Sequence, residues 1–449
     1  MRGLRSTIAF VVILAGLGAY IYFVTWKQPE TPDNGKKLEK VFTVAADKID
    51  ELQVTTSAGD ATTAKKDGTT WKLTEPVAAA ADEAELSGIT NAIATADVVR
   101  VVADNPTSLN EYGLSNPRVT VAFKAAGDKD FRRLSIGEKT PTGGDVFAKR
   151  GDEKKVFLIA AFQEASLNKT TFDLRDKSIL KVDRDKIDKL EVTTTGQPLT
   201  IVKDGGDWKV KTPIDVRADY GMVEGLIGRL QTAHMKSIVA DDASPADLKK
   251  YGLDKPQATV DLNAGSAKAS LILGAKADDT SIYARDASKP MVVTVESSLL
   301  DEVKKGADDY RRKDLFEFRA YNANHIEFTR NGQTVAFDRV KSDKEGTPDK
   351  WHRASPNAGD VDKDKFDAFL GRLANMRADK FVASTASTGL DKPALVIDIK
   401  FDDSKKQERV TFGQSGQDVY AAKPGEPGAA KTDTADFNET LKSLDELSK

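Results

Sequence analysis

Ile49-Asp-Glu-Leu-Gln-Val-Thr-Thr56 is a short stretch of alternating apolar residues that returns twice in the same 449-residue chain. It recurs as Ile187-Asp-Lys-Leu-Glu-Val-Thr-Thr194 and, more faintly, as His325-Ile-Glu-Phe-Thr329. Alternation with a period of two is the pattern of a half-buried β-strand. A strand that occurs three times predicts a fold that is built three times.

Two further markers follow this strand, each time in the same order. They are a tryptophan on a returning strand and a Gly-Leu-x-x-Pro corner: Trp71, Trp208 and Trp351, then Gly113, Gly252 and Gly389 with Pro117, Pro256 and Pro393. The tryptophans are 137 and 143 residues apart, and the glycines are 139 and 137 residues apart. Solenoid repeats are only about 20–50 residues long, so a unit of this length is a whole domain with a core of its own.

The markers divide the chain into five predicted segments. These are a cytoplasmic stub with a transmembrane helix (1–26), a linker (27–40), and three repeats at 41–178, 179–316 and 317–449. In each repeat, a strand, a hairpin and a helix beginning near Asp82, Asp219 or Asp362 precede the corner, and alternating strands and a short helix follow it. The predicted fold class is α+β, with mainly antiparallel sheets and two helices in each repeat.

The N-terminal segment predicts a membrane anchor. Ile8 to Trp26 contains no charged residue, and Arg2 and Arg5 precede it. A helix of this length spans about 28 Å, close to the ~30 Å of a hydrocarbon core. Basic residues before the segment place the N-terminus in the cytoplasm and the rest of the chain outside. The alternative is a cleaved signal peptide, for which Leu17-Gly-Ala19 is a poor cleavage site. We expect an uncleaved anchor in a bacterial inner membrane, with the bulk of the chain in the periplasm.

Composition excludes several classes of function. The chain has 67 basic and 70 acidic residues and a net charge of −3, whereas nucleic-acid binding asks for a clustered basic face. It has no cysteine, which removes disulfides, thiolate metal sites and thiol nucleophiles. No phosphate-binding loop or nucleophile motif is present in a suitable context. No cofactor is expected.

Few residues suggest metal chemistry. His234, His325 and His352 are the only histidines, and they occupy unmatched positions without ligand spacing, so we expect surface or packed histidines and no metal site. Asp183-Arg-Asp185 and Asp362-Lys-Asp364 resemble the start of a calcium loop. Both lack the glycine at position six and the glutamate at position twelve, which favours turns and helix N-caps.

The repeated tryptophans and the closing arginines have two interpretations each. The tryptophans could line carbohydrate or peptide sites, but their position on a strand after a tight turn favours core packing. Arg175, Arg311 and Arg312 close successive repeats. We expect them to pair with acidic groups at repeat junctions, with anion binding as the alternative.

The Trp-Lys strand, the Tyr-Gly-Leu-x-x-Pro corner and the Phe/Tyr-x-x-Arg-x-Lys-like closure resemble the bacterial family called domain of unknown function 4340. The resemblance covers nearly everything from Val41 to the C-terminus. It implies a membrane-anchored extracytoplasmic protein, often encoded beside gliding-type ABC exporter components. It transfers no chemistry, because the family has no established catalytic residues.

These observations lead to one main hypothesis of function and two alternatives. The main hypothesis is a non-enzymatic, single-pass scaffold or accessory subunit of an ABC-type export complex, with integral transporter subunits as partners. The first alternative is an envelope binding protein that holds a glycan or lipid in a groove between repeats. The second is a glycan-active hydrolase with paired carboxylates, disfavoured because no nucleophile–base set is visible.

Overall fold

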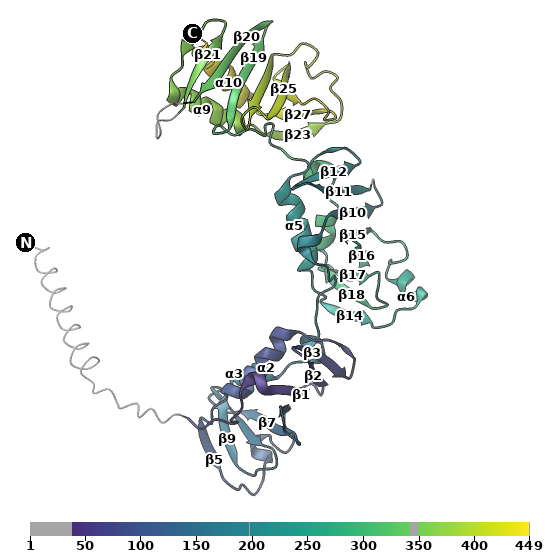
Figure 1. Cartoon of the computed structure of the whole chain (residues 1–449). Coiled ribbons are helices and arrows are strands. Elements are labelled where there is room, and N and C mark those ends of the chain that lie inside the picture. The colour runs from purple at the N-terminus through teal and green to yellow at the C-terminus, as the bar shows by residue number, and fades with distance from the viewer. Residues whose placement is uncertain (1–37, 197, 342–348, 449) are drawn as a thin grey trace, which may run out of the picture. The chain divides into compact units, whose positions relative to one another are not determined.

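The computed structural model describes residues 38–196, 198–341 and 349–448 (Figure 1). The predicted anchor at 8–26 and residues 27–37 of the predicted linker lie outside this part of the chain. Within it, no helix has the length and apolar character needed to cross a membrane. The chain divides between Asp176 and Lys177 into two compact units.

Three nine-stranded antiparallel sheets make up the described part of the chain, and their strand order is the same. In the first sheet the order is β4-β3-β2-β1-β6-β7-β8-β9-β5. We call the three bodies copy 1, copy 2 and copy 3. The strands of copy 1 are β1 (Ile49–Thr55), β2 (Ala61–Asp67), β3 (Thr70–Glu75), β4 (Ala79–Ala80), β5 (Arg100–Ala103), β6 (Val119–Ala125), β7 (Arg132–Lys139), β8 (Asp145–Arg150) and β9 (Val156–Ala160). Those of copy 2 are β10 (Lys189–Thr194), β11 (Leu199–Asp204), β12 (Asp207–Thr212), β13 (Val216–Arg217), β14 (Ser237–Ala240), β15 (Ala258–Ala264), β16 (Ala267–Lys276), β17 (Ser281–Asp286) and β18 (Val292–Glu296). Those of copy 3 are β19 (Ala323–Arg330), β20 (Gln333–Val340), β21 (Lys350–Ser355), β22 (Gly359–Asp360), β23 (Ala378–Val382), β24 (Leu395–Phe401), β25 (Lys406–Ser415), β26 (Asp418–Ala422) and β27 (Ala429–Thr432).

The strand with the repeated Ile49–Thr56 pattern lies next to the central strand of each sheet. Leu52 of β1 is opposite Ala64 of β2 on one side and Phe123 of β6 on the other. Its side chain is fully buried, because alternate residues of a strand point to the same face and this face is the core. The α+β class and the tandem β-rich repeats predicted from the sequence are confirmed.

The helices differ more among the copies than the strands do. The α-helices of the described residues are α2 (Glu83–Thr95), α3 (Phe162–Leu167) and α4 (Thr171–Leu174) in copy 1; α5 (Tyr220–Gln231), α6 (Pro245–Lys250), α7 (Ser298–Val303) and α8 (Ala307–Tyr310) in copy 2; and α9 (Lys363–Ala374) and α10 (Thr434–Leu447) in copy 3. Short 3-10 turns are η2 (Ala46–Lys48), η3 (Asn110–Tyr112) and η4 (Arg184–Lys186). Two helices per copy is therefore right for copy 3 and too few for copies 1 and 2.

The extra helices have local causes. In copy 2, Ser244 and Asp247 form a capping box, with the Asp247 amide donating to the Ser244 hydroxyl at 3.2 Å, and Pro245 fits the first helical turn. The corner of copy 2 therefore forms α6, whereas the corner of copy 1 forms only η3. In the single turns α4 and α8, Asp173 and Asp309 at the third helical position accept from the backbone amides of the N-cap residues Thr170 (2.9 Å) and Gly306 (2.8 Å). Such four-residue elements are too short to show a helical period in the sequence.

The first long helix of each copy begins where the sequence predicted. Asp82, Asp219 and Asp362 are the N-caps of α2, α5 and α9. The Asp219 carboxylate, for example, accepts from the Met222 amide at 3.0 Å, which satisfies one of the free donors of the first turn. The apolar side of each helix then covers the inner face of its sheet (Figure 1).

The tryptophans are core residues in all three copies. Trp71, Trp208 and Trp351 are 3%, 2% and 5% exposed. The cross-strand partner of each is a cation, and the Nζ atoms of Lys66 and Lys203 lie 5.3 and 5.6 Å from the ring centres of Trp71 and Trp208. The indoles are thus buried beneath the sheet edge, with a cation over each of the first two rings.

The Gly-Leu-x-x-Pro corner rests against a second glycine. Gly389 has a φ of +74°, and Gly413 on β25 lies directly against it. A Cβ atom on Gly413 would come within 2.5 Å of the Thr388 carbonyl oxygen and 2.6 Å of the Gly389 carbonyl carbon. The equivalent pairs are Gly113 with Gly137, and Gly252 with Gly274. At these points two backbones approach so closely that no side chain fits between them.

Candidate functional site

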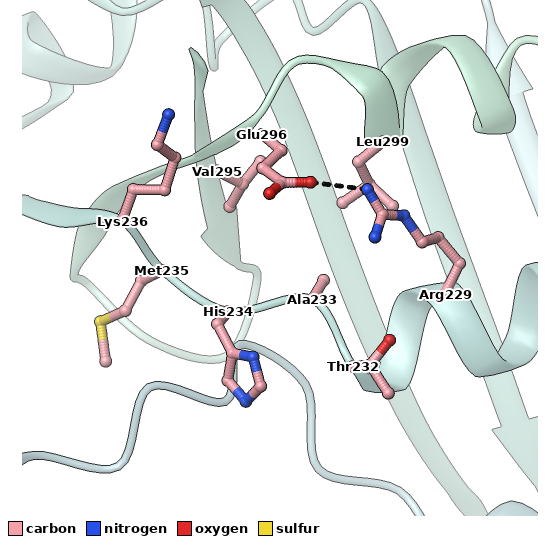
Figure 2. A pocket seen from close by; sticks show the side chains of 9 residues that line it. All are labelled: Arg229, Thr232, Ala233, His234, Met235, Lys236, Val295, Glu296 and Leu299. Atoms are coloured by element: carbon pink, nitrogen blue, oxygen red, sulfur yellow. Dashed lines mark hydrogen bonds and ion pairs between the residues drawn. The ribbon is translucent and has the colours of Figure 1, made fainter. Parts of the chain in front are cut away.

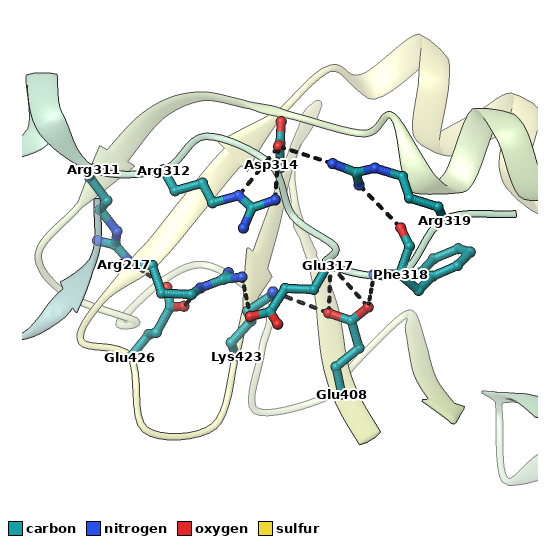
Figure 3. Close-up of polar contacts among 10 residues, drawn as sticks. All are labelled: Arg217, Arg311, Arg312, Asp314, Glu317, Phe318, Arg319, Glu408, Lys423 and Glu426. Atoms are coloured by element: carbon teal, nitrogen blue, oxygen red, sulfur yellow. Dashed lines mark hydrogen bonds and ion pairs between the residues drawn. The ribbon is translucent and has the colours of Figure 1, made fainter. Parts of the chain in front are cut away.

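A cluster of charged side chains joins copies 2 and 3. Its members, which we call the junction cluster, come from β13, the connection after α8, β25 and the β26–β27 loop: Arg217, Arg311, Arg312, Asp314, Glu317, Glu408, Lys423 and Glu426 (Figure 3). Residues that are far apart in sequence therefore lie together at the connection between copies 2 and 3.

Backbone pairing positions the arginines of copy 2. The single turn α8 ends at Tyr310, and the extended chain that follows pairs Arg311 with Ala218 in an isolated β-bridge. The Arg312 amide donates to the Arg217 carbonyl at 2.9 Å. Arg217 and Arg311 consequently point at copy 3 from two adjacent strands.

Glu426 accepts hydrogen bonds from both arginines. Its Oε1 atom is 3.1 Å from Nε of Arg217, and its Oε2 atom is 3.1 Å from Nη2 of Arg311. Arg217 also pairs with Glu317 through Nη1. One carboxylate of copy 3 is thereby held by two charge-assisted hydrogen bonds from copy 2.

Arg311 is the most buried cation of the cluster. It is 5% exposed, and its guanidinium carbon lies 4.0 Å from the ring centre of Phe381 on β23. Its Nε atom is buried without a hydrogen-bond partner in the structure. Stacking on an aromatic face and pairing with a carboxylate both suit the planar guanidinium, so a lysine would be a poor substitute here.

Asp314 and Glu408 complete the cluster on the side of copy 3. The Asp314 carboxylate lies 3.3 Å from Arg312, 3.8 Å from Arg319 and 3.6 Å from Arg377. Glu408 accepts backbone hydrogen bonds from Glu317 and Phe318 and is 3.3 Å from Nζ of Lys423 (Figure 3). The connecting segment is therefore fixed to the sheet that follows it.

The ionisation of the junction cluster follows from burial and charge. Burial raises the pKa of Glu426, but the positive charge of Arg217 and the hydrogen bond from Arg311 outweigh it, so the pKa lies below its usual value. Burial lowers the pKa of Lys423, and the nearby charge of Arg217 lowers it further against the opposing effect of Glu408. Glu426 therefore stays ionised at neutral pH.

The predicted junction arginines are found in different settings. Arg311 pairs with Glu426 across the two copies, and Arg312 pairs with Asp314 in the connection itself. Arg175, at the same place after α4 as Arg311 after α8, forms a β-bridge with Ala81 in copy 1. Glu426, which the sequence analysis did not single out, is the acidic partner.

An apolar cavity of about 340 Å³ adjoins the junction cluster. Pro213, Ile214 and Ala307 of copy 2 form one side of it, and Phe381 and Pro427 of copy 3 form the other. Asp308 and Arg311 also line it and supply polar groups. This cavity is the structural counterpart of the groove between repeats that the alternative hypothesis requires.

A second pocket, of about 150 Å³, lies at the end of α5 (Figure 2). Arg229 and Lys236 line it, but Arg229 is 2.6 Å from Glu296 and Lys236 donates to Thr280 at 3.0 Å. Both cations are therefore engaged within copy 2. His234 also lines this pocket, and its backbone pairs with Ser178.

The residues equivalent to His234 in copies 1 and 3, Asp97 and Arg377, each form an ion pair across their β-bridge. Copy 1 has Lys40 with Asp97 at 2.9 Å, and copy 3 has Asp314 with Arg377 at 3.6 Å, both across the same isolated β-bridge. The basic residue is the first of the pair in copy 1 (Lys40) and the second in copy 3 (Arg377), so the two pairs have opposite polarity. His234 thus occupies a structural position where the chain enters each copy.

The remaining metal candidates are accounted for by local contacts. Asp183 caps η4 and Asp362 caps α9, as expected for turns and N-caps. His352 is 2.9 Å from Asp360. Within the described residues, no group of three or more acidic or histidine side chains is arranged to hold a metal ion.

His325 is placed between two carboxylates on the outward face of copy 3. Its Nδ1 atom is 2.6 Å from Asp338 and its Nε2 atom 2.8 Å from Glu327. Glu327 is in turn directly opposite Asp398 on β24. Burial raises the pKa of Asp398, and the charge of Glu327 raises it further against the effect of Arg409. Polar side chains of three neighbouring strands thus lie side by side on this face of the sheet.

We expect the stability of copy 3 to depend on pH through His325. Burial lowers its pKa, but the hydrogen bonds to Asp338 and Glu327 outweigh burial, so the pKa is raised in the folded protein. A raised pKa stabilises the fold below the unfolded value of about 6.5, and this contribution disappears as the pH rises through the folded pKa. Nuclear magnetic resonance titration of the histidine ring should show the higher midpoint, and Asp338→Asn should lower it. A midpoint below that of a free histidine would contradict the assignment.

A family model described as "Domain of unknown function (DUF4340)" matches the chain over residues 71–212 and 208–393. The two matches begin at Trp71 and Trp208, which are equivalent positions in copies 1 and 2. No curated protein matches the sequence.

Proposed function

Because this chain belongs to the DUF4340 family, whose function is undefined, we propose its role from its own architecture. We propose that it is a single-pass, membrane-anchored scaffold or accessory subunit of an ABC-type export complex. It carries out no reaction itself. Its three β-rich copies stand outside the membrane and contact integral transporter subunits.

The observation that carries this proposal is the way one fold is reused with different charged surfaces. The three sheets have the same strand order, and most of the buried residues of each copy are apolar. At the same place in the last loop, copies 1, 2 and 3 carry Glu153, Lys289 and Glu426. A shared fold with variable loops suits an array whose copies bind different partners.

The proposed anchor would make weak contacts sufficient. The apolar segment Ile8–Trp26 would keep the array beside proteins of the same membrane, which raises its effective concentration there. The bulk of the chain would then be periplasmic, as the arginines before the segment predict.

Crosslinking in native membranes tests the proposal. A lysine-reactive crosslinker applied to cells that produce the full chain should recover ABC permease subunits with it, identified by mass spectrometry. The matched control is a secreted variant without residues 1–26, which should recover much less permease because it is no longer held at the membrane. Recovery of the same soluble proteins from both, without any permease, would refute the proposal.

The apolar cavity beside the junction cluster favours one alternative, a binding protein for a lipid-like ligand. Its volume of about 340 Å³ is at the lower end of small-molecule sites, which are about 300–1,000 Å³. A fluorescent fatty acid should then bind the chain at one site, and Ala383→Trp, which fills the cavity, should abolish binding. The matched control Ala287→Trp, in a loop of copy 2, should leave it unchanged. Equal binding by all three proteins would exclude this role for the cavity.

A further inference from the structure

The contact between copies 2 and 3 shows which residues of one copy bind the copy that precedes it in the chain. Copy 3 presents two features at its edge: the carboxylate of Glu426 in the β26–β27 loop, and Phe381 on the edge strand β23. Copy 2 supplies Arg217 and Arg311, and Arg311 touches both features. We call this edge of a copy its receiving face.

The register of the sheets identifies the same face in copy 1. Ala421 pairs with Ala430 in copy 3, and Ala148 pairs with Phe157 in copy 1, so the connecting turns have the same length. The fifth residue after Ala421 is Glu426, and the fifth after Ala148 is Glu153. By the same reasoning, the partner of Ala430 on β23 is Phe381, and the partner of Phe157 on β5 is Val101. Copy 1 therefore has both elements, a carboxylate and an apolar residue on the edge strand.

In copy 1 this face is exposed. The Glu153 side chain is 51% exposed, against 23% for Glu426. Among the described residues, its ion pair is with its own neighbour Arg150 at 3.3 Å. Val99 and Val101 are each 40% exposed, which makes them two of the few large apolar side chains on the surface of the described chain.

We infer that the receiving face of copy 1, formed by Val99, Val101 and Glu153, binds an arginine-bearing segment of a partner protein. The inference rests on the proposed scaffold function and adds the surface and the chemistry of the partner. The arginine would pair with Glu153 as Arg311 pairs with Glu426, and an apolar residue beside it would cover the two valines. A planar guanidinium can lie against an apolar surface while it donates to a carboxylate, which favours arginine over lysine.

The charges argue against a second molecule of this chain as the occupant. Arg217 and Asp360 hold the same register position in copies 2 and 3, opposite Lys209 and His352. If the end of copy 3 from another molecule docked on copy 1, Asp360 would face Glu153, and like charges at a contact are unfavourable. The arginines of copy 2 are already bound to copy 3.

Basic side chains of copy 1 itself lie near Glu153, but they do not take the place of the partner's arginine. Lys155 is 3.6 Å from Asp104, and Arg150 also pairs with Glu39 at 3.3 Å. Lys154 is exposed beside Glu153 and takes the place of Pro427 in copy 3. Glu153 is therefore the carboxylate on which we expect the partner's arginine to depend, and its replacement should weaken binding strongly.

Site-directed crosslinking tests this inference. Because the chain has no cysteine, an introduced cysteine is the only one that can be labelled. Val101→Cys in the full-length chain is labelled with a benzophenone maleimide and irradiated in native membranes. Val340→Cys, 50% exposed on copy 3, is the matched control. We expect a product at Val101 and not at Val340, and we expect the crosslinked peptide of the partner to contain an arginine. Glu153→Lys should lower the yield at least five-fold, and changing the partner's arginine to glutamate should restore it in that variant.

Several outcomes would overturn the inference. They are no product at Val101 above the control, a product unchanged by Glu153→Lys, a crosslink to residues 1–37 of the same chain, and a crosslink to a second copy of the chain. The lysine-reactive experiment separates this result from the wider proposal. If it recovers the permease while Val101 gives no product, the scaffold function stands and only this surface is wrong.

Discussion

Gly413→Ala is expected to lower the free energy of unfolding of copy 3 by about 3 kcal/mol or more. The new Cβ would lie 2.5 Å from the Thr388 carbonyl oxygen and from the Leu390 amide nitrogen, which are backbone atoms. A flexible side chain could move aside, but these atoms belong to the corner that ends in Pro393. Relief therefore requires the corner to separate from β25. Urea denaturation followed by tryptophan fluorescence, to which Trp351 contributes from copy 3, measures the change.

The control is another glycine of the same copy. Gly371 lies in α9, and a Cβ atom there would meet nothing within 4 Å. Gly371→Ala should be neutral or stabilising by about 0.5–1 kcal/mol, because alanine favours the helix over glycine. If the two substitutions have similar effects, the close approach of the two backbones is not what holds the corner.

Glu426→Gln is expected to lower the free energy of unfolding of the second unit by about 2 kcal/mol. Removing one partner of a buried ion pair costs about 3–5 kcal/mol because the other charge is left unpaired, and the partial exposure of Glu426 reduces this figure. The substitution leaves Arg311 buried against Phe381 without its carboxylate. The same contact should also weaken in acid. The pKa of Glu426 is depressed in the folded protein, so its contribution is present above the unfolded pKa and is lost as the pH falls through the folded one.

Glu153→Gln is the matched control, since Glu153 holds the same position in copy 1. It is half exposed and paired only locally among the described residues, so its loss should change the stability of the purified chain by less than about 0.5 kcal/mol. Trp71 reports on copy 1, and Trp208 and Trp351 report on copies 2 and 3. Equal effects of the two substitutions would mean that the pairing between copies 2 and 3 contributes little to stability.

The sequence predicted the fold better than the site, for a physical reason. The first strand of each copy, the tryptophan hairpin and the Gly-Leu-x-x-Pro corner are local patterns, and a local pattern can be recognised in one segment. Gly413 lies within β25, and its role depends on Gly389, which is brought to it only by folding. The extra helices were missed because single turns such as α4 and α8 are too short to show a period.

The arginines of the junction could be singled out, but their partner could not. Arg311 and Glu426 are 115 residues apart, and their contact requires the correct register of several strands. The equivalence of Glu153 and Glu426 is equally hidden, because the two loops differ in sequence and only the strand pairing aligns them. The predicted anchor and the partners remain predictions.

The exchanged charges at the entry to copies 1 and 3 bear on how a chain of three similar folds avoids assembling wrongly. Tandem domains of like sequence are prone to pairing an element of one with the sheet of another. If the entry strand of copy 3 joined the body of copy 1, Asp314 would meet Asp97, and in the reverse exchange Lys40 would meet Arg377. Both wrong pairings bring like charges together, whereas both correct ones are attractive. The same two positions that fasten each copy would thus help each segment of a newly made chain to find its own sheet.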